Sequence, residues 1–329
     1  MAATIHEVAR RAGVSASTVS RAFSSPDLLR EATRSAVLAA AAELGYTPSR
    51  VAQGLVTGRT GNLGMLVPDI ANPFFPPLVK GATNRAIGAD MSVLLASSDL
   101  DPTREQRLVR QMAGQVDGLL LCSTQLPDEV LAELAAELPT VLVNRTGPGL
   151  AAVLVDTASG MRDAVDHLAA LGHRGVVYLS GPDDSWSNAQ RRQALRAHTR
   201  RRGLALSVLG PYLPSYESGV QAADRVLESG ATAVIAYDDQ MALGVLSRLY
   251  ERGAAVPSDV SVIGCDDVLP MGLARPALTT VSAPCELVGR AAVELLLARQ
   301  PGQPAPTGTG ETRYPGQLVV RASTGPAPR

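Results

Sequence analysis

The sequence predicts an N-terminal all-α headpiece with a helix-turn-helix, followed by a larger α/β body of two lobes. Three observations support this division. Two short amphipathic patterns meet at a glycine near the N-terminus, strand-like and helical runs alternate over the rest of the 329 residues, and charge is unevenly distributed. A chain of this length can form more than one domain with a sizeable core.

The first helix is expected to begin at Thr4, because Thr4 and Glu7 have the spacing of a capping box. Gly13 can adopt the positive φ of a tight turn, and Ser15 is the expected N-cap of a second helix. A third helix is expected over residues 30–44. Two short helices joined by a tight turn form a helix-turn-helix.

The second helix is expected to expose Ala16, Ser17, Ser20 and Arg21. Small side chains let a helix enter the major groove of DNA, and Arg21 can reach a guanine edge or a phosphate. Residues 1–60 hold seven arginines and four acidic residues, whereas the whole chain has a net charge of −1, so a basic module precedes an acidic body. The alternative is a three-helix bundle whose polar faces only meet solvent.

The body alternates buried strand-like runs with helical patterns. The expected strands are 63–67, 92–96, 118–122, 140–143, 176–180, 207–209, 233–236 and 261–264. The clearest helices between them are 77–89, 104–115, 190–202, 217–228 and 240–252. Such alternation predicts two parallel α/β units with a cleft, and ligands bind where loops leave the carboxyl ends of parallel strands.

Cofactor and metal motifs are not expected. A GxGxxA string over residues 147–152 fits a dinucleotide-binding fingerprint, but the strand expected at 153–155 stands where phosphate binding needs a helix N-terminus. We therefore interpret the string as a loop. Cys122, Cys265 and Cys285 are widely spaced and have no metal-ligand or CxxC pattern, which favours reduced thiols.

Neither an export signal nor a membrane span is expected. The N-terminal MAATIHEVARR has no apolar signal core, and no apolar run reaches about 18 residues. With 46% apolar and 19% charged residues, the composition is that of a globular protein, and a cytoplasmic location is predicted.

The sequence resembles the LacI/GalR family of bacterial regulators over essentially its whole length. The motifs are TIHEVARRAGVSASTVSRAF, AVLAAAAELGYTPS, LVTGRTGNLGMLVPDIANPFF, AYDDQMALG, VPSDVSVIGCDD, RPALTTVSAP and VVRAST. The resemblance implies a repressor that binds a pseudo-palindromic DNA operator as a homodimer or tetramer. It also implies allosteric control by a small-molecule effector, bound in the interlobe cleft of a type 1 periplasmic-binding-protein-like domain.

The resemblance implies three segments: a headpiece over 1–48, a hinge helix and linker over 49–60, and an effector-binding and dimerisation domain over 61–329. Within the last, one lobe comprises about 61–158 and 284–317, and the other about 159–283 and 318–329.

Residues for DNA contact are also implied by the resemblance. Ala16, Ser17 and Arg21 match base-reading positions, and Thr4, Ser15, Thr18 and Ser20 match phosphate-contacting or capping positions. Because Ala16 and Ser17 are small, methyl contacts and DNA bending are expected to carry more of the specificity.

In the hinge, Leu55 matches an apolar wedge that opens the minor groove. Gln53 stands where the family usually has Arg. A glycine inside a helix, such as Gly54, lowers helix stability by about 0.5–1 kcal/mol relative to alanine. The hinge is therefore expected to be marginal until DNA binds. The alternative role for Leu55 is that of a core residue.

The resemblance assigns the effector cleft to Asn72, Phe74, Asn144, Arg191, Asp238 and Asp266. Other roles are open for four of them: helix capping by Asn72, loop stabilisation by the two aspartates, and ordinary surface charge for Arg191. Pro214 stands near the usual place of an aromatic plate, for which Tyr212 and Tyr216 are possible substitutes. Asp238 replaces a more frequent Asn. A sugar or related polar metabolite is favoured, while a nucleoside or an amino-acid-like effector stays open.

Two other classes of protein fit the sequence less well. A solute-binding protein for transport would carry an export signal in place of the N-terminal module. An enzyme would need a catalytic set, but no Ser/His/Asp arrangement, metal cluster or cofactor loop is evident, and His167, His173 and His198 are expected to be structural. A regulator that is not an enzyme is therefore favoured.

Overall fold

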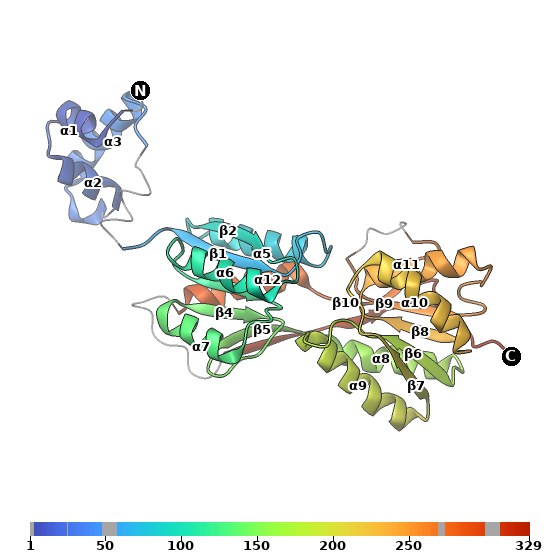
Figure 1. Cartoon of the computed structure of the whole chain (residues 1–329). Helices are drawn as coiled ribbons and strands as arrows, with labels where there is room; N and C mark the ends of the chain where they lie inside the picture. Colours follow the sequence, from blue (N-terminus) through green and yellow to red (C-terminus); the bar gives the residue numbers. More distant parts are fainter. Residues whose placement is uncertain (1–2, 25, 48–57, 269–273, 300–309) are drawn as a thin grey trace. The chain divides into compact units, whose positions relative to one another are not determined.

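The computed structural model describes residues 3–24, 26–47, 58–268, 274–299 and 310–329. Within it the chain divides into two compact units (Figure 1). The first comprises residues 1–62 with 115–117, and the second comprises the rest of the chain. Leu55 and the other residues at 48–57 lie outside the described part.

The first unit contains the predicted helix-turn-helix. Its helices are α1 (Ile5–Ala12), α2 (Ala16–Ser24) and α3 (Glu31–Glu43), with a short 3-10 helix at Pro26–Leu28. The capping box is present, because the Thr4 N–H donates to Glu7 Oε2 at 2.7 Å and the Glu7 N–H donates to Thr4 Oγ1 at 3.4 Å. Gly13 ends α1 with a φ of 64°. A small apolar core formed by Val8, Val19 and Val37 holds the three helices together.

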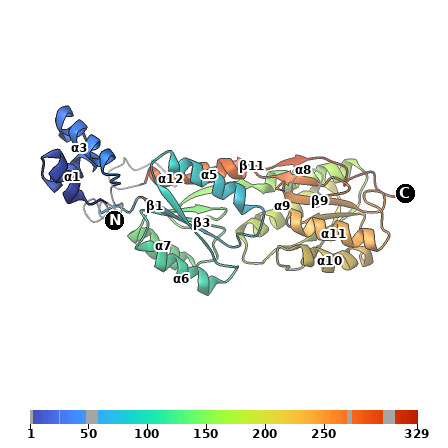
Figure 2. The same cartoon turned by 90° about the horizontal axis from the view of Figure 1, so that it is seen from above.

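The first sheet of the second unit has the strand order β11-β5-β4-β3-β1-β2. Its strands are β1 (Asn62–Val67), β2 (Ser92–Ser97), β3 (Leu119–Cys122), β4 (Thr140–Val143), β5 (Ala151–Asp156) and β11 (Glu311–Pro315). Helices α5 (Phe75–Ile87) and α12 (Cys285–Leu297) cover one face, and α6 (Pro102–Ala113) and α7 (Asp128–Glu137) cover the other (Figure 2). The inner strands are buried on both sides, which explains their continuous apolar runs.

The second sheet has the order β12-β10-β9-β8-β6-β7. Its strands are β6 (Gly175–Leu179), β7 (Ala205–Leu209), β8 (Ala233–Ala236), β9 (Ser261–Asp266), β10 (Thr279–Ser282) and β12 (Gln317–Val319). Helices α8 (Thr157–Ala170) and α9 (Trp186–Arg202) pack on one face, and α10 (Tyr216–Glu228) and α11 (Asp239–Glu251) on the other. The only antiparallel pair with a register among the described strands is β10 with β12. The α/β fold of two parallel units is confirmed.

The chain passes between the sheets three times, from β5 to α8, from β10 to α12 and from β11 to β12. The GxGxxA string forms a turn that leads directly into β5, as the loop interpretation predicted. None of the described helices is long and apolar enough to cross a membrane.

Glycines allow two helix pairs to pack backbone to backbone. A Cβ at Gly81 of α5 would lie 2.1 Å from the carbonyl oxygen of Glu286 in α12, and Gly289 makes an equally close approach in return. Gly219 and Gly244 repeat this arrangement between α10 and α11. Each lobe therefore has one helix pair that tolerates no side chain at its crossing point.

We predict that Gly81→Ala destabilises the body by about 1–3 kcal/mol, because the added methyl group meets backbone that cannot move aside. Gly114→Ala is the matched control, since Gly114 has an ordinary φ of −80° and nothing lies within 4 Å of its added Cβ. Thermal unfolding of the full chain measures both. Equal midpoints for the two variants would contradict the close-packing argument.

Candidate functional site

The outer face of α2 is the candidate DNA-reading surface. Ser17 and Arg21 are exposed and stand one helical turn apart, so their side chains share a face. Thr18 and Ser20 are half-buried. Ala16 is also half-buried and packs against the headpiece core, so only part of its methyl group is available for contact.

The start of α2 is organised around Ser15. Its hydroxyl accepts from the Thr18 N–H at 3.2 Å and forms hydroxyl–hydroxyl bonds with Ser17 at 2.8 Å and Thr18 at 2.9 Å. The predicted N-cap is thus in place. Because the Ser17 hydroxyl is already engaged, it has less capacity for base recognition than an isolated serine would have.

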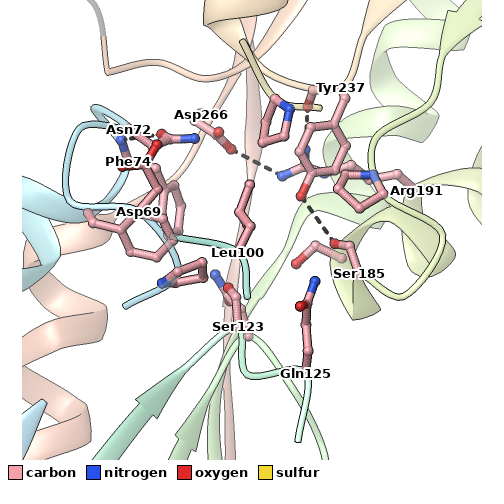
Figure 3. Close-up of a pocket in the computed structure, with 16 residues that line it drawn as sticks. Asp69, Asn72, Phe74, Leu100, Ser123, Gln125, Ser185, Arg191, Tyr237 and Asp266 are labelled. Carbon is pink, nitrogen blue, oxygen red and sulfur yellow. Dashed lines mark hydrogen bonds and ion pairs between the residues drawn. The ribbon is translucent and has the colours of Figure 1, made fainter. Parts of the chain in front are cut away.

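The second site is a cleft at the carboxyl ends of strands from both sheets (Figure 3). Five of the six predicted effector residues line it: Asn72, Phe74, Asn144, Arg191 and Asp266. Asp238 is buried behind this lining rather than in it. The cleft also takes in residues that the sequence did not single out, among them Asp69, Ser123, Gln125, Ser185 and Tyr237.

Arg191 joins the start of α8 to the ends of β8 and β9. Its Nε donates to Thr157 Oγ1 at 3.1 Å, its Nη1 donates to the carbonyl oxygen of Tyr237, and its Nη2 pairs with Asp266 Oδ1 at 3.1 Å. The Arg191 side chain is 5% exposed, so it is not an ordinary surface charge. Its cation is already balanced by a carboxylate, and among the described lining residues it is the only arginine or lysine.

Tyr237 supplies the aromatic surface of the second lobe. The Arg191 guanidinium lies 4.8 Å from the centre of its ring, and its hydroxyl bonds to Ser185 Oγ at 3.1 Å. A Cβ at Gly181 would lie 2.5 Å from this ring, so the ring depends on a glycine beneath it.

The suggestion that Tyr212 or Tyr216 supplies the aromatic surface is wrong. Neither lines the cleft, because Tyr212 packs against the core under α10 and α11, and Tyr216 begins α10 with 41% exposure. Pro214 does line the cleft. Tyr237 directly follows the buried strand β8, but an aromatic residue at such a position also fits a core role, so the sequence held no signal that separates the two.

The two asparagines of the first lobe use their oxygens structurally. Asn72 Oδ1 accepts from the Phe74 N–H at 2.9 Å in the turn before α5, but the N-cap of α5 is Phe74 and has no side-chain cap, so Asn72 stabilises the turn and does not cap the helix. Asn144 Oδ1 accepts from the Val155 N–H at 2.9 Å. Their amide nitrogens have different surroundings. The Asn72 side chain also interacts with the Asp238 carboxyl and opposes the rise of its pKa, whereas no hydrogen bond from the Asn144 amide nitrogen is found among the described residues, so Asn144 is the clearer donor for a ligand.

The backbone is strained where three strands end in the cleft. Ser123, Asn144 and Asp266 have positive φ values of 47°, 54° and 109°. Non-glycine residues adopt such angles only where the surrounding structure enforces them, and they cluster at ligand sites.

Asp238 is the unusual charge of the site. Its Oδ1 caps α11 by accepting from the Met241 N–H at 2.9 Å, whereas its Oδ2 is the one buried side-chain polar atom in the described ranges without a hydrogen-bond partner. Burial raises the pKa of Asp238 to about 7, reinforced by Asp266 and opposed by the Met241 N–H and Arg191. Burial also raises the pKa of Asp266, in spite of Arg191 beside it.

We predict that Asp238→Asn removes part of the pH dependence of stability. The unfolded carboxyl titrates near pH 3.8, so between pH 4 and 7 the folded state holds a proton that the unfolded state has lost. Wild-type stability therefore falls as the pH rises through this window. The free energy of unfolding of the variant, relative to that of wild type, should rise by about 2.5 kcal/mol between pH 5 and pH 8, measured by denaturant unfolding. Parallel pH profiles for the two proteins would contradict the raised pKa.

Comparison with known proteins identifies a family for each of the two parts of the chain. Residues 4–49 match the family model of bacterial regulatory proteins of the lacI family, and residues 165–324 match that of a periplasmic binding protein-like domain. The HTH-type transcriptional repressor CytR of Escherichia coli (strain K12) is 32% identical over 333 residues, which cover 98% of this chain and 96% of that protein.

Solved structures agree over the same length. A lac repressor dimer bound to operator and the anti-inducer ONPF superposes with a TM-score of 0.88 at 29% identity, covering 99% of this chain and all of that one. A complex of the transcriptional regulator CelR with cellobiose has a TM-score of 0.71 at 32% identity, covering 98% and 99% of the two chains. The present chain therefore belongs to the LacI family of bacterial transcriptional regulators.

Proposed function

We propose that this protein is a transcriptional repressor that binds a pseudo-palindromic operator as a dimer and is controlled by a small polar metabolite in the interlobe cleft. The observation that carries the proposal is the combination, in one chain, of an exposed Ser17–Arg21 helix face and a polar cleft lined from both lobes. A C2 dimer presents two such faces, which matches the symmetry of a palindromic site. The operator-bound lac repressor dimer supports the same assembly.

For DNA recognition, we assign base reading to Ala16, Ser17 and Arg21, and backbone contact or helix capping to Thr4, Ser15, Thr18 and Ser20. Leu55 is the proposed minor-groove wedge. The domain division at 1–48, 49–60 and 61–329 remains part of this proposal, as does a cytoplasmic location, where the operator would be.

The effector is best matched by an uncharged molecule rich in hydroxyl groups. Asp266 already neutralises Arg191, and Asp69 adds a further carboxylate to the lining, so the cleft offers no unbalanced cation to an anion. Carboxylates accept from hydroxyls, and the amides of Asn72 and Asn144 donate to them. The cellobiose complex of CelR supports a sugar.

Effector binding is proposed to change the angle between the lobes, and with it the separation of the two hinges in the dimer. Hinge helices then form or melt, and operator affinity changes. By linkage, operator DNA must change effector affinity by the same factor.

The decisive experiment is selection of bound sequences from a random duplex library, with and without a panel of sugars and other metabolites. An enriched palindrome whose recovery changes with one metabolite is expected. No enrichment under any condition would refute the repressor proposal. The same selection with Ser17→Gln should shift the preferred base at the position that Ser17 reads.

We predict that Arg21→Ala weakens binding to the selected operator by about 1–3 kcal/mol, the range for loss of an arginine contact to a base. Arg10→Ala is the control, because Arg10 is an equally exposed headpiece cation on α1 rather than on the reading helix. Fluorescence anisotropy measures both. Equal losses would indicate that Arg21 acts only through general charge.

We predict that the double variant Arg191→Gln/Asp266→Asn binds operator as wild type does but no longer responds to the effector. Removing both partners avoids the cost of about 3–5 kcal/mol for leaving one buried charge unpaired. Operator affinity is measured across an effector titration. A full response in the double variant would remove the cleft from the mechanism.

A further inference from the structure

Helix α9 has a composition unlike that of the rest of the chain. Its 17 residues include six arginines and no acidic residue, although the whole chain has a net charge of −1. Three of these arginines have structural partners. Arg191 belongs to the cleft, Arg192 pairs with Asp183 at 2.7 Å, and Arg202 pairs with Asp166 at 2.6 Å.

The other three are exposed and have no ion pair within the described ranges: Arg196, Arg200 and Arg201. Arg162 of α8 is also exposed and lines the same groove as Arg201. We call these four residues the arginine face. The exposed carboxylates nearest to it in sequence, Asp163 and Asp184, form no ion pair with it. Asp183 lines the same groove as Arg196 and Arg200 but is paired with Arg192, so the face still carries an excess of positive charge.

The surface between these arginines is low. Gln193 and Ala197 are exposed on α9 and line both of the open grooves beside it. Arg196 and Arg200 line one groove, and Arg162 and Arg201 line the other. The opposite side of α9 is held by Leu195 in the core under the second sheet. A rigid helix thus presents cations around short side chains that would not obstruct an approaching backbone.

Helix stability accounts for only part of this pattern. Cations in the last turn interact favourably with the helix dipole, which accounts for Arg200 and Arg201. Arg196 lies further from the C-terminus and Arg162 belongs to a different helix, so neither gains from that effect. Four exposed like charges on adjoining surfaces repel one another, and a bound polyanion removes this cost.

We propose that the arginine face binds the phosphate backbone of a second segment of duplex DNA, without regard to its sequence. The inference rests on the proposed function, because a protein held on an operator experiences neighbouring DNA at high effective concentration. Residues four apart on a helix are separated by about 6 Å along its axis, which lets Arg196 and Arg200 contact different phosphates of one strand. The protein would then bridge two DNA segments through one chain.

The test uses the full-length protein in a capture assay. Protein is loaded onto a surface-attached duplex that carries the selected operator, and a labelled duplex of about 30 base pairs without operator is added at low salt. Arg196→Gln/Arg200→Gln is compared with Arg107→Gln/Arg110→Gln, which removes two exposed arginines without ion pairs from α6. Glutamine keeps the helix propensity of arginine, so both double variants should fold.

Wild type and the α6 control should capture the labelled duplex, whereas Arg196→Gln/Arg200→Gln should capture several-fold less with unchanged operator affinity. For the captured duplex, the slope of log affinity against log salt should be smaller by roughly 1.8 in this variant, which corresponds to the loss of two phosphate contacts. Equal capture by both double variants, or no capture by wild type, overturns the inference. Equal capture would assign the second duplex to the headpieces of a larger oligomer instead of the arginine face.

Two further outcomes distinguish DNA bridging from self-association and from failure of the repressor proposal. If the arginine face instead binds an acidic surface of a second copy, low salt will cause self-association without DNA that Arg196→Gln/Arg200→Gln abolishes, and this overturns the DNA proposal. If no operator can be selected, the repressor proposal fails. The capture experiment can then be repeated with protein loaded on a duplex of random sequence, and the same difference between the two double variants tests the arginine face.

Discussion

The ligand cleft depends on one guanidinium placed inside the protein. Arg191 reaches from α9 to the start of α8 and to the ends of β8 and β9, and each contact satisfies a donor that burial would otherwise leave unpaired. Its pairing with Asp266 makes the charge tolerable, and its position beneath Tyr237 fixes the aromatic surface. Four separate segments of the second lobe are thereby held in one geometry before any ligand arrives. This preorganisation reduces the cost of ordering the site on binding.

The central architecture was predictable because it follows from burial. Strands such as β3 and β4, covered by helices on both faces, must be continuously apolar, and those runs are visible in the sequence. The two strands on either side of the last crossover, β11 and β12, were not predicted. β11 is mostly exposed, with Glu311 and Arg313 among its residues, and β12 is only three residues long, so neither carries an apolar period. Their pairing is set by long-range topology, which local composition does not record.

The candidate site was predictable to the level of strand ends, but not to the direction of each side chain. Arg191 and Asp266 meet as their motif positions imply. Asp238 follows a strand in the same manner, yet its backbone turns it into the N-cap of α11, behind the lining. Tyr237 was overlooked because an aromatic residue after a buried strand has the same pattern as a core residue. Which of two neighbouring side chains enters the cleft depends on a few backbone angles. The positive φ values in these loops are set by the surrounding fold, so the local sequence does not predict them.

The contact between Gly181 and Tyr237 also bears on how such a regulator could diversify. Because the ring occupies the space that any side chain at position 181 would need, the two positions are not free to vary independently. A lineage that replaces the glycine must first reduce the aromatic residue, and a lineage that loses the ring opens room for a substituent on either side. Loss of the ring removes its contact with the Arg191 guanidinium but leaves the pairing of Arg191 with Asp266 in place. Descendants could thus exchange one effector for another by a paired substitution, while the ion pair of the pocket is inherited.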